Sequence, residues 1–168
     1  MNVPNYITDN LKYSIRPYQE ESFRRYIYSD IEDFDGKPNK PYHLLYNMAT
    51  GSGKTLVMAG LILYLYEKGY RNFLFFVNSN NIINKTKDNF LNPQSSKYLF
   101  ANKIVVNSKE VFVKEVQNFD EADNQNITIN FVSIQKLTSG LFTNVKENGI
   151  SFEDFENRKT VLISDEAH

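Results

Sequence analysis

The segment that most constrains the fold is the eight-residue run from Met48 to Thr55, MATGSGKT. It follows a short apolar stretch at residues 42–47 and precedes a long apolar stretch that ends before Gly69. Two glycines with one residue between them allow a tight turn in which backbone N–H groups face inward. A strand, a glycine turn and a helix in this order are typical of a phosphate-binding loop. The segment therefore predicts an α/β domain with a helix that begins at Lys54 and points its positive end at an anion.

The rest of the chain alternates between strand-like and helix-like stretches, which favours a central, mainly parallel sheet in a three-layer α/β domain. Residues 35–41 form a predicted loop, because they are rich in glycine and proline. Residues 108–126 are ambiguous, since Val111 and Val113 alternate as in a strand but lie among charged residues. The predicted strands are residues 42–47, 72–77, 103–107, 127–132 and 160–164, and the predicted helices are residues 17–34, 54–68, 79–91 and 133–137.

Composition excludes several classes of site. The chain has 168 residues, which suits one domain, and it has no cysteine, so disulfides, thiolate metal sites and thiol catalysis are excluded. Its net charge of −1 means that any nucleic-acid binding must come from a local surface. The longest apolar stretch, residues 56–66, is too short to span a membrane, and no secretory signal is visible at the N-terminus. We therefore expect a cytoplasmic protein without a membrane partner.

The residues of the loop have distinct chemical roles in this prediction. Gly51 and Gly53 bring backbone N–H groups close to phosphate oxygens, and Thr50 and Ser52 complete the turn. Lys54 brings a positive charge to the β- and γ-phosphates, and the Thr55 hydroxyl can ligate Mg²⁺. The segment departs from the strict phosphate-loop pattern in one place, because that pattern has glycine where this chain has methionine.

An acidic segment follows the last predicted strand. Asp165-Glu166-Ala167-His168 comes directly after the apolar run TVLIS, which places Asp165 at the carboxyl end of a parallel strand. Open α/β sheets bind their ligands at this edge. Asp165 can hold Mg²⁺ directly or through water, and Glu166 can polarise the attacking water. We therefore expect catalytic roles for Glu166 and Lys54.

Together these motifs resemble the first RecA-like domain of superfamily-two DEAD/DEAH helicases and translocases. The segment Ile15-Arg16-Pro17-Tyr18-Gln19 is similar to the glutamine motif of that superfamily, which implies that Gln19 reads adenine. The segments NFLFFVNSNNIINKT and VSIQKL look most like the restriction (Res) subunits of type III restriction–modification systems. Type I restriction motors and DNA-repair helicases share much of this pattern, so they remain alternatives.

The resemblance implies ATP and Mg²⁺ as ligands and an intact protein that moves on duplex DNA by ATP hydrolysis, coupled to endonuclease cleavage. It implies one domain over residues 1–168, with the helix and glutamine motif in 1–41 and the phosphate-loop core in 42–168, ending at the DEAH box. A second RecA-like domain and a methyltransferase-specificity subunit are the implied partners. We expect this chain alone to turn over little ATP. The alternatives are a nucleotide-binding module without turnover and a phosphate-loop ATPase that moves no nucleic acid.

Two further segments resemble motifs that contact the nucleic-acid backbone in this superfamily, residues 77–81 and Ser133-Ile134-Gln135-Lys136. Hydroxyl and amide side chains beside helix N-termini suit phosphate oxygens. The alternative for both segments is ordinary N-capping of a helix. The local excess of lysine between residues 81 and 109 fits either a DNA-facing patch or a solvated helix face.

Overall fold

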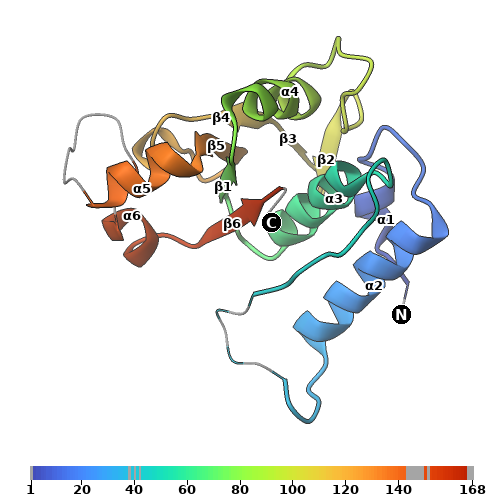
Figure 1. Cartoon of the computed structure of the whole chain (residues 1–168). Coiled ribbons are helices and arrows are strands. Elements are labelled where there is room, and N and C mark those ends of the chain that lie inside the picture. The colour runs from blue at the N-terminus through green and yellow to red at the C-terminus, as the bar shows by residue number, and fades with distance from the viewer. Residues whose placement is uncertain are drawn as a thin grey trace.

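The computed structural model describes residues 2–37, 39, 41, 43–142, 150 and 152–165, and Figure 1 shows its helices and strands. The helices are α1 (Asn5–Thr8), α2 (Pro17–Ile31), α3 (Lys54–Glu67), α4 (Asn80–Leu91), α5 (Ile134–Phe142) and α6 (Phe152–Glu156), with a 3₁₀ turn η1 at Phe119–Glu121. The strands are β1 (Asn72–Val77), β2 (Ile104–Val106), β3 (Lys109–Val111), β4 (Val113–Glu115), β5 (Ile127–Ser133) and β6 (Thr160–Ser164).

The main sheet has the order β4-β5-β1-β6, and all of its pairings are parallel. Phe76 of β1 pairs with Ser164 of β6, and Val77 pairs with Ser133 of β5. The strands β1, β5 and β6 therefore end at the same edge of the sheet, the edge where parallel sheets bind ligands. The prediction of an α/β fold around a mainly parallel sheet is confirmed.

The strand β1 is buried on both faces, as expected for a central parallel strand. Phe73, Phe75 and Val77 belong to the larger apolar core, together with Phe90 of α4 and many residues of α3. Leu74 points to the other face, where a smaller cluster includes Val116, Phe119 and Ile150. Helices flank the sheet (Figure 1), so burial on both faces explains why the sequence of β1 is almost entirely apolar.

The helix α2 packs on α3 at a very close approach. A Cβ atom at Gly60 of α3 would lie 2.4 Å from the ring of Phe23, which is fully buried. Further along the same interface, the Tyr64 hydroxyl donates to Asp30 Oδ2 at 2.8 Å. Burial, followed by this hydrogen bond, raises the pKa of Tyr64. These contacts fix α2 on α3, and so they set where the N-terminal end of α2 lies.

The structure overturns one predicted strand. Residues 43–47 form no strand, and Leu45 is 86% exposed. A strand needs a hydrogen-bonded neighbour, and none of the described strands pairs with this segment. The apolar pattern is present, but no pairing partner for it is found in the described part of the chain.

Several predicted boundaries also change. The helix predicted for residues 17–34 ends at Ile31, and the short helix predicted after Ser133 extends to Phe142. The ambiguous region contains the antiparallel pair β2–β3 and the short strand β4. Within the described ranges, no helix has the length and apolar character needed to cross a membrane.

Candidate functional site

The loop before α3 has the backbone conformation that the sequence predicts. Gly51 has φ 77° and Gly53 has φ 79°, both in the left-handed region that glycine adopts without strain. The Ser52 N–H donates to the carbonyl of Ala49 at 3.1 Å and closes the turn. Gly53 is the N-cap of α3, so Lys54 is the first residue of the helix, as expected.

This turn leaves backbone donors without acceptors. Among the described residues, no acceptor is found for the N–H groups of Gly53, Lys54 and Thr55. In addition, the Ser52 hydroxyl is buried and has no hydrogen-bond partner in the described ranges. Free N–H groups at a helix N-terminus bind anions, and buried polar groups normally have partners. The loop therefore fits a phosphate group.

The Lys54 side chain bends back over the loop. Its ammonium group donates to the Met48 carbonyl at 3.2 Å, and the residue is half-buried. A peptide carbonyl is a weaker partner for an ammonium group than a phosphate oxygen is. When an anion binds in the loop, the Lys54 ammonium group can therefore exchange the neutral Met48 carbonyl for a charged oxygen.

The glutamine motif contacts the loop directly. Gln19 is 3% exposed, and its Nε2 donates to the Ser52 carbonyl at 2.8 Å. The Tyr18 hydroxyl donates to the same carbonyl at 2.9 Å. The Tyr18 side chain is 42% exposed. Its contact lies 34 residues away in the chain, so no local pattern could have revealed it.

The acidic segment is described only in part. Asp165 directly follows β6 at the carboxyl edge of the sheet, as the sequence predicts. Glu166 and His168 lie outside the described residues. Among the described residues, no group of three or more His, Cys, Asp or Glu side chains could hold a metal ion. The assignment of Thr55 and Asp165 as Mg²⁺ ligands and of Glu166 as a catalytic residue stays a prediction, as does adenine reading by Gln19.

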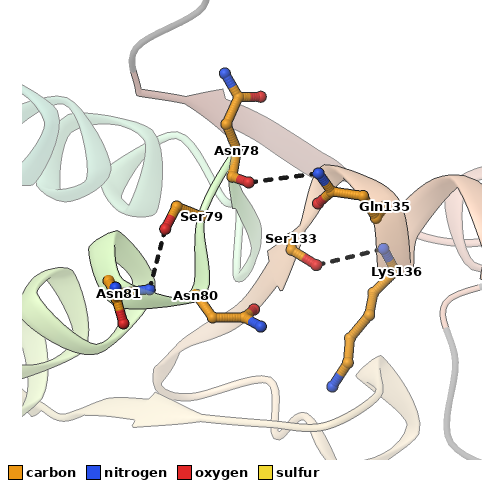
Figure 2. A pocket seen from close by; sticks show the side chains of 7 residues that line it. All are labelled: Asn78, Ser79, Asn80, Asn81, Ser133, Gln135 and Lys136. Carbon is orange, nitrogen blue, oxygen red and sulfur yellow. Dashed lines mark hydrogen bonds between the residues drawn. The ribbon is translucent and has the colours of Figure 1, made fainter.

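A cavity of about 540 Å³ opens at the same edge of the sheet, after β1 and β5. Figure 2 shows that its polar lining comes from the N-terminal ends of α4 and α5. Ser79 accepts from the Asn81 N–H, and Ser133 accepts from the Lys136 N–H, each at 3.3 Å. Both serines therefore cap helices. The lining residues are Asn78, Ser79, Asn80, Asn81, Ser133, Gln135 and Lys136.

Capping does not use up the donors of this cavity. A serine hydroxyl that accepts one hydrogen bond still has its own hydrogen to donate. Lys136 is exposed, and no partner for its ammonium group is found in the described part of the chain. Two segments that the sequence predicts to contact nucleic acid, residues 77–81 and 133–136, thus line one cavity. The structure brings them together, although they lie more than 50 residues apart.

The two loop glycines are expected to differ in their tolerance of alanine. Both replacements place an L-residue at positive φ, which costs about 1–2 kcal/mol. At Gly51 the new Cβ would meet nothing within 4 Å, whereas at Gly53 it would lie 2.5 Å from Gln19 Nε2. We expect Gly53→Ala to lower the free energy of unfolding by about 0.5–1.5 kcal/mol more than Gly51→Ala, because the Gln19 amide has to move and loses its hydrogen bond to Ser52. Urea unfolding of both variants measures the difference, and equal destabilisation would contradict the close Gln19 contact.

Comparisons with known proteins agree with this geometry. Residues 12–168 match the family model described as "Type III restriction enzyme, res subunit". The chain is 42% identical, over 170 aligned residues, to the probable type III restriction-modification enzyme HindVIP Res subunit of Haemophilus influenzae. That alignment covers 99% of this chain and 33% of the relative, so the chain spans about a third of the relative's length. No solved structure matches the chain.

Proposed function

Because this chain belongs to the family of type III restriction enzyme Res subunits, we propose that it is the nucleotide-binding part of an ATP-driven DNA translocase. The observation that carries the proposal is the loop of residues 50–55. Three observations support a phosphate site there: N–H groups for which the described residues offer no acceptor, two glycines at positive φ, and a lysine at the start of α3. In our proposal the domain is the first RecA-like unit of a longer motor.

The roles of the residues follow from their chemistry. The N–H groups of Gly51, Gly53, Lys54 and Thr55 bind the β- and γ-phosphates of ATP, and Lys54 balances their charge. The Thr55 hydroxyl and the Asp165 carboxylate would hold Mg²⁺, which neutralises phosphate charge when bound. Glu166 orients and polarises the attacking water. Gln19 is the proposed contact to adenine. Its Oε1 accepts from the Arg16 N–H and keeps one lone pair for the base, whereas its Nε2 donates to the carbonyls of Ser52 and Gly53 and would have to turn from the loop to donate to adenine.

The cavity at the ends of β1 and β5 is the proposed contact to DNA. It lies beside two helix N-termini, and its side chains are amides, hydroxyls and one lysine. These groups match phosphate oxygens and carry no base-specific pattern. We propose that this cavity binds the backbone of duplex DNA and does not distinguish between base sequences.

We propose that the rest of the activity needs parts of a longer protein, since this chain matches about a third of its relative. A second RecA-like domain would close over ATP and supply arginine side chains to the transition state. DNA cleavage and a methyltransferase-specificity partner are proposed only for the longer protein, by analogy with the family. Motors of type I systems and repair helicases remain the alternative, and the family match favours the type III assignment.

We expect this chain alone to bind duplex DNA weakly and with a strong dependence on salt, because it carries only part of the proposed track. Lys136→Ala should weaken binding several-fold and reduce the slope of log K against log salt by about one, since one phosphate contact is lost. Lys68→Ala, at the C-terminal end of α3, is the matched control. Fluorescence anisotropy at several salt concentrations measures both quantities. Tight binding that does not change with salt, or an unchanged slope in Lys136→Ala, would count against the proposed interface.

A further inference from the structure

The Ser52 carbonyl is held from outside the loop by two side chains of α2. The Tyr18 hydroxyl donates to it at 2.9 Å, and Gln19 Nε2 donates at 2.8 Å. A carbonyl oxygen has two lone pairs, so these donors saturate it. The two contacts fix the direction in which this carbonyl points, which is toward the N-terminal end of α2.

This direction determines where the next N–H group points. The peptide between Ser52 and Gly53 is planar, and in a trans peptide the C=O and the N–H point in opposite directions. The Gly53 N–H therefore points away from α2, and it has no acceptor among the described residues. A flipped peptide would instead turn the Ser52 carbonyl toward the phosphate site, where it would repel phosphate oxygens.

Arg16 orients both of these donors. Its Nη1 donates to the Tyr18 hydroxyl at 3.0 Å, so the single hydrogen of that hydroxyl is left to bind Ser52. The Arg16 backbone N–H donates to Gln19 Oε1 at 2.9 Å, which turns Nε2 of the amide toward the loop. A cation that donates to a hydroxyl also strengthens the hydrogen bond that the hydroxyl donates.

We propose that Tyr18 is a positioning residue of the phosphate site, which keeps the Ser52–Gly53 peptide in the orientation that presents the Gly53 N–H to phosphate. The inference rests on the proposed nucleotide binding and adds a residue to it. Tyr18 does not touch the ligand in this proposal. It acts through the loop, and its partly exposed ring lies outside the buried core, so removal of the hydroxyl leaves the packing of α2 intact.

The test is Tyr18→Phe, which removes the hydroxyl and keeps the ring. Tyr28→Phe is the matched control, because Tyr28 lies on the same helix and is similarly exposed, at 49%. Calorimetric titration with ATP, GTP, inorganic tripolyphosphate and adenosine, each with Mg²⁺, separates phosphate from base contacts. We expect Tyr18→Phe to lower the affinity for ATP, for GTP and for tripolyphosphate by the same factor, about three- to tenfold, because one hydrogen bond is lost. Adenosine binding should be unchanged.

A second measurement does not depend on ligand affinity. The chain has seven glycines, so labelling with ¹⁵N-glycine gives a simple spectrum. In the nucleotide-free protein, we expect Tyr18→Phe to shift and broaden the Gly53 amide signal and Tyr28→Phe to leave it in place.

The outcomes are distinguishable. Loss of ATP and adenosine affinity with unchanged tripolyphosphate affinity would make Tyr18 a base contact and overturn the inference. Unchanged affinities and an unchanged Gly53 signal would overturn it as well. If the unaltered chain binds neither ATP nor tripolyphosphate, the proposed function fails, and the Gly53 signal then shows whether Tyr18 still orients the loop.

Discussion

Replacing Lys54 by alanine is expected to lower the affinity of this chain for ATP by about 100-fold. The lysine is the first residue of α3, and its ammonium group rests on the Met48 carbonyl at 3.2 Å. When phosphate binds, this neutral partner is exchanged for charged oxygens on two phosphate groups. A hydrogen bond to a charged group contributes about 1.5–3 kcal/mol. A loss of about 2.7 kcal/mol corresponds to the expected 100-fold change, at about 1.36 kcal/mol per tenfold.

Calorimetric titration with ATP and Mg²⁺ measures this change, and thermal unfolding checks that the variant is folded. Lys68→Ala is the matched control, because it removes a lysine from the opposite end of the same helix. Its affinity for ATP should equal that of the unaltered chain. A Lys54→Ala variant that binds ATP as well as the control would show that the loop does not hold the triphosphate.

Hydrolysis of ATP by this chain alone is expected to be slower by a factor of about 10³–10⁵ than by a longer protein with the second RecA-like domain. Arginine side chains supplied by a partner surface contribute a factor of this size in related phosphoryl-transfer systems. This factor corresponds to about 4–7 kcal/mol of transition-state stabilisation. Phosphate release with and without duplex DNA measures it. Glu166→Gln in the longer protein should abolish turnover and leave ATP affinity nearly unchanged, because the residue acts on water and not on phosphate.

Two results would contradict this expectation. Turnover near one per second by the 168-residue chain, stimulated by DNA, would show that it needs no second domain. A large loss of ATP affinity in Glu166→Gln would move that residue from the water to the phosphate or metal site.

Sequence patterns predicted the parts of the fold that depend on local chemistry. The buried strand β1 and the helix start at Lys54 follow from apolar runs and glycines, which act over a few residues. The cap at Ser79 agrees with the alternative of ordinary N-capping for residues 77–81. The strand predicted at residues 42–47 failed for a different reason. An apolar run shows that a segment can pair in a sheet, but the pairing depends on a neighbour that the run does not specify.

The candidate site also combines features that local sequence predicts with contacts that depend on the tertiary structure. The loop glycines and Lys54 were predicted from their spacing, and their backbone conformation agrees with the prediction. The contacts of Tyr18 and Gln19 with Ser52 were not predicted, because they depend on how α2 docks against α3. That docking depends on the fit of Phe23 against Gly60, which only the tertiary structure shows.

Binding of the triphosphate of ATP by residues 50–55 can be followed residue by residue in backbone NMR spectra of the ¹⁵N-labelled chain during titration with ATP and Mg²⁺. We expect the largest shift changes at the amides of Gly51, Gly53, Lys54 and Thr55, and we expect tripolyphosphate to cause the same changes. Amides at the start of a helix respond strongly when an anion takes their free N–H groups. Saturation with ATP that leaves these four amide signals unchanged, or that shifts mainly the amide signals around Ser79 and Ser133, would show that the triphosphate does not bind in this loop.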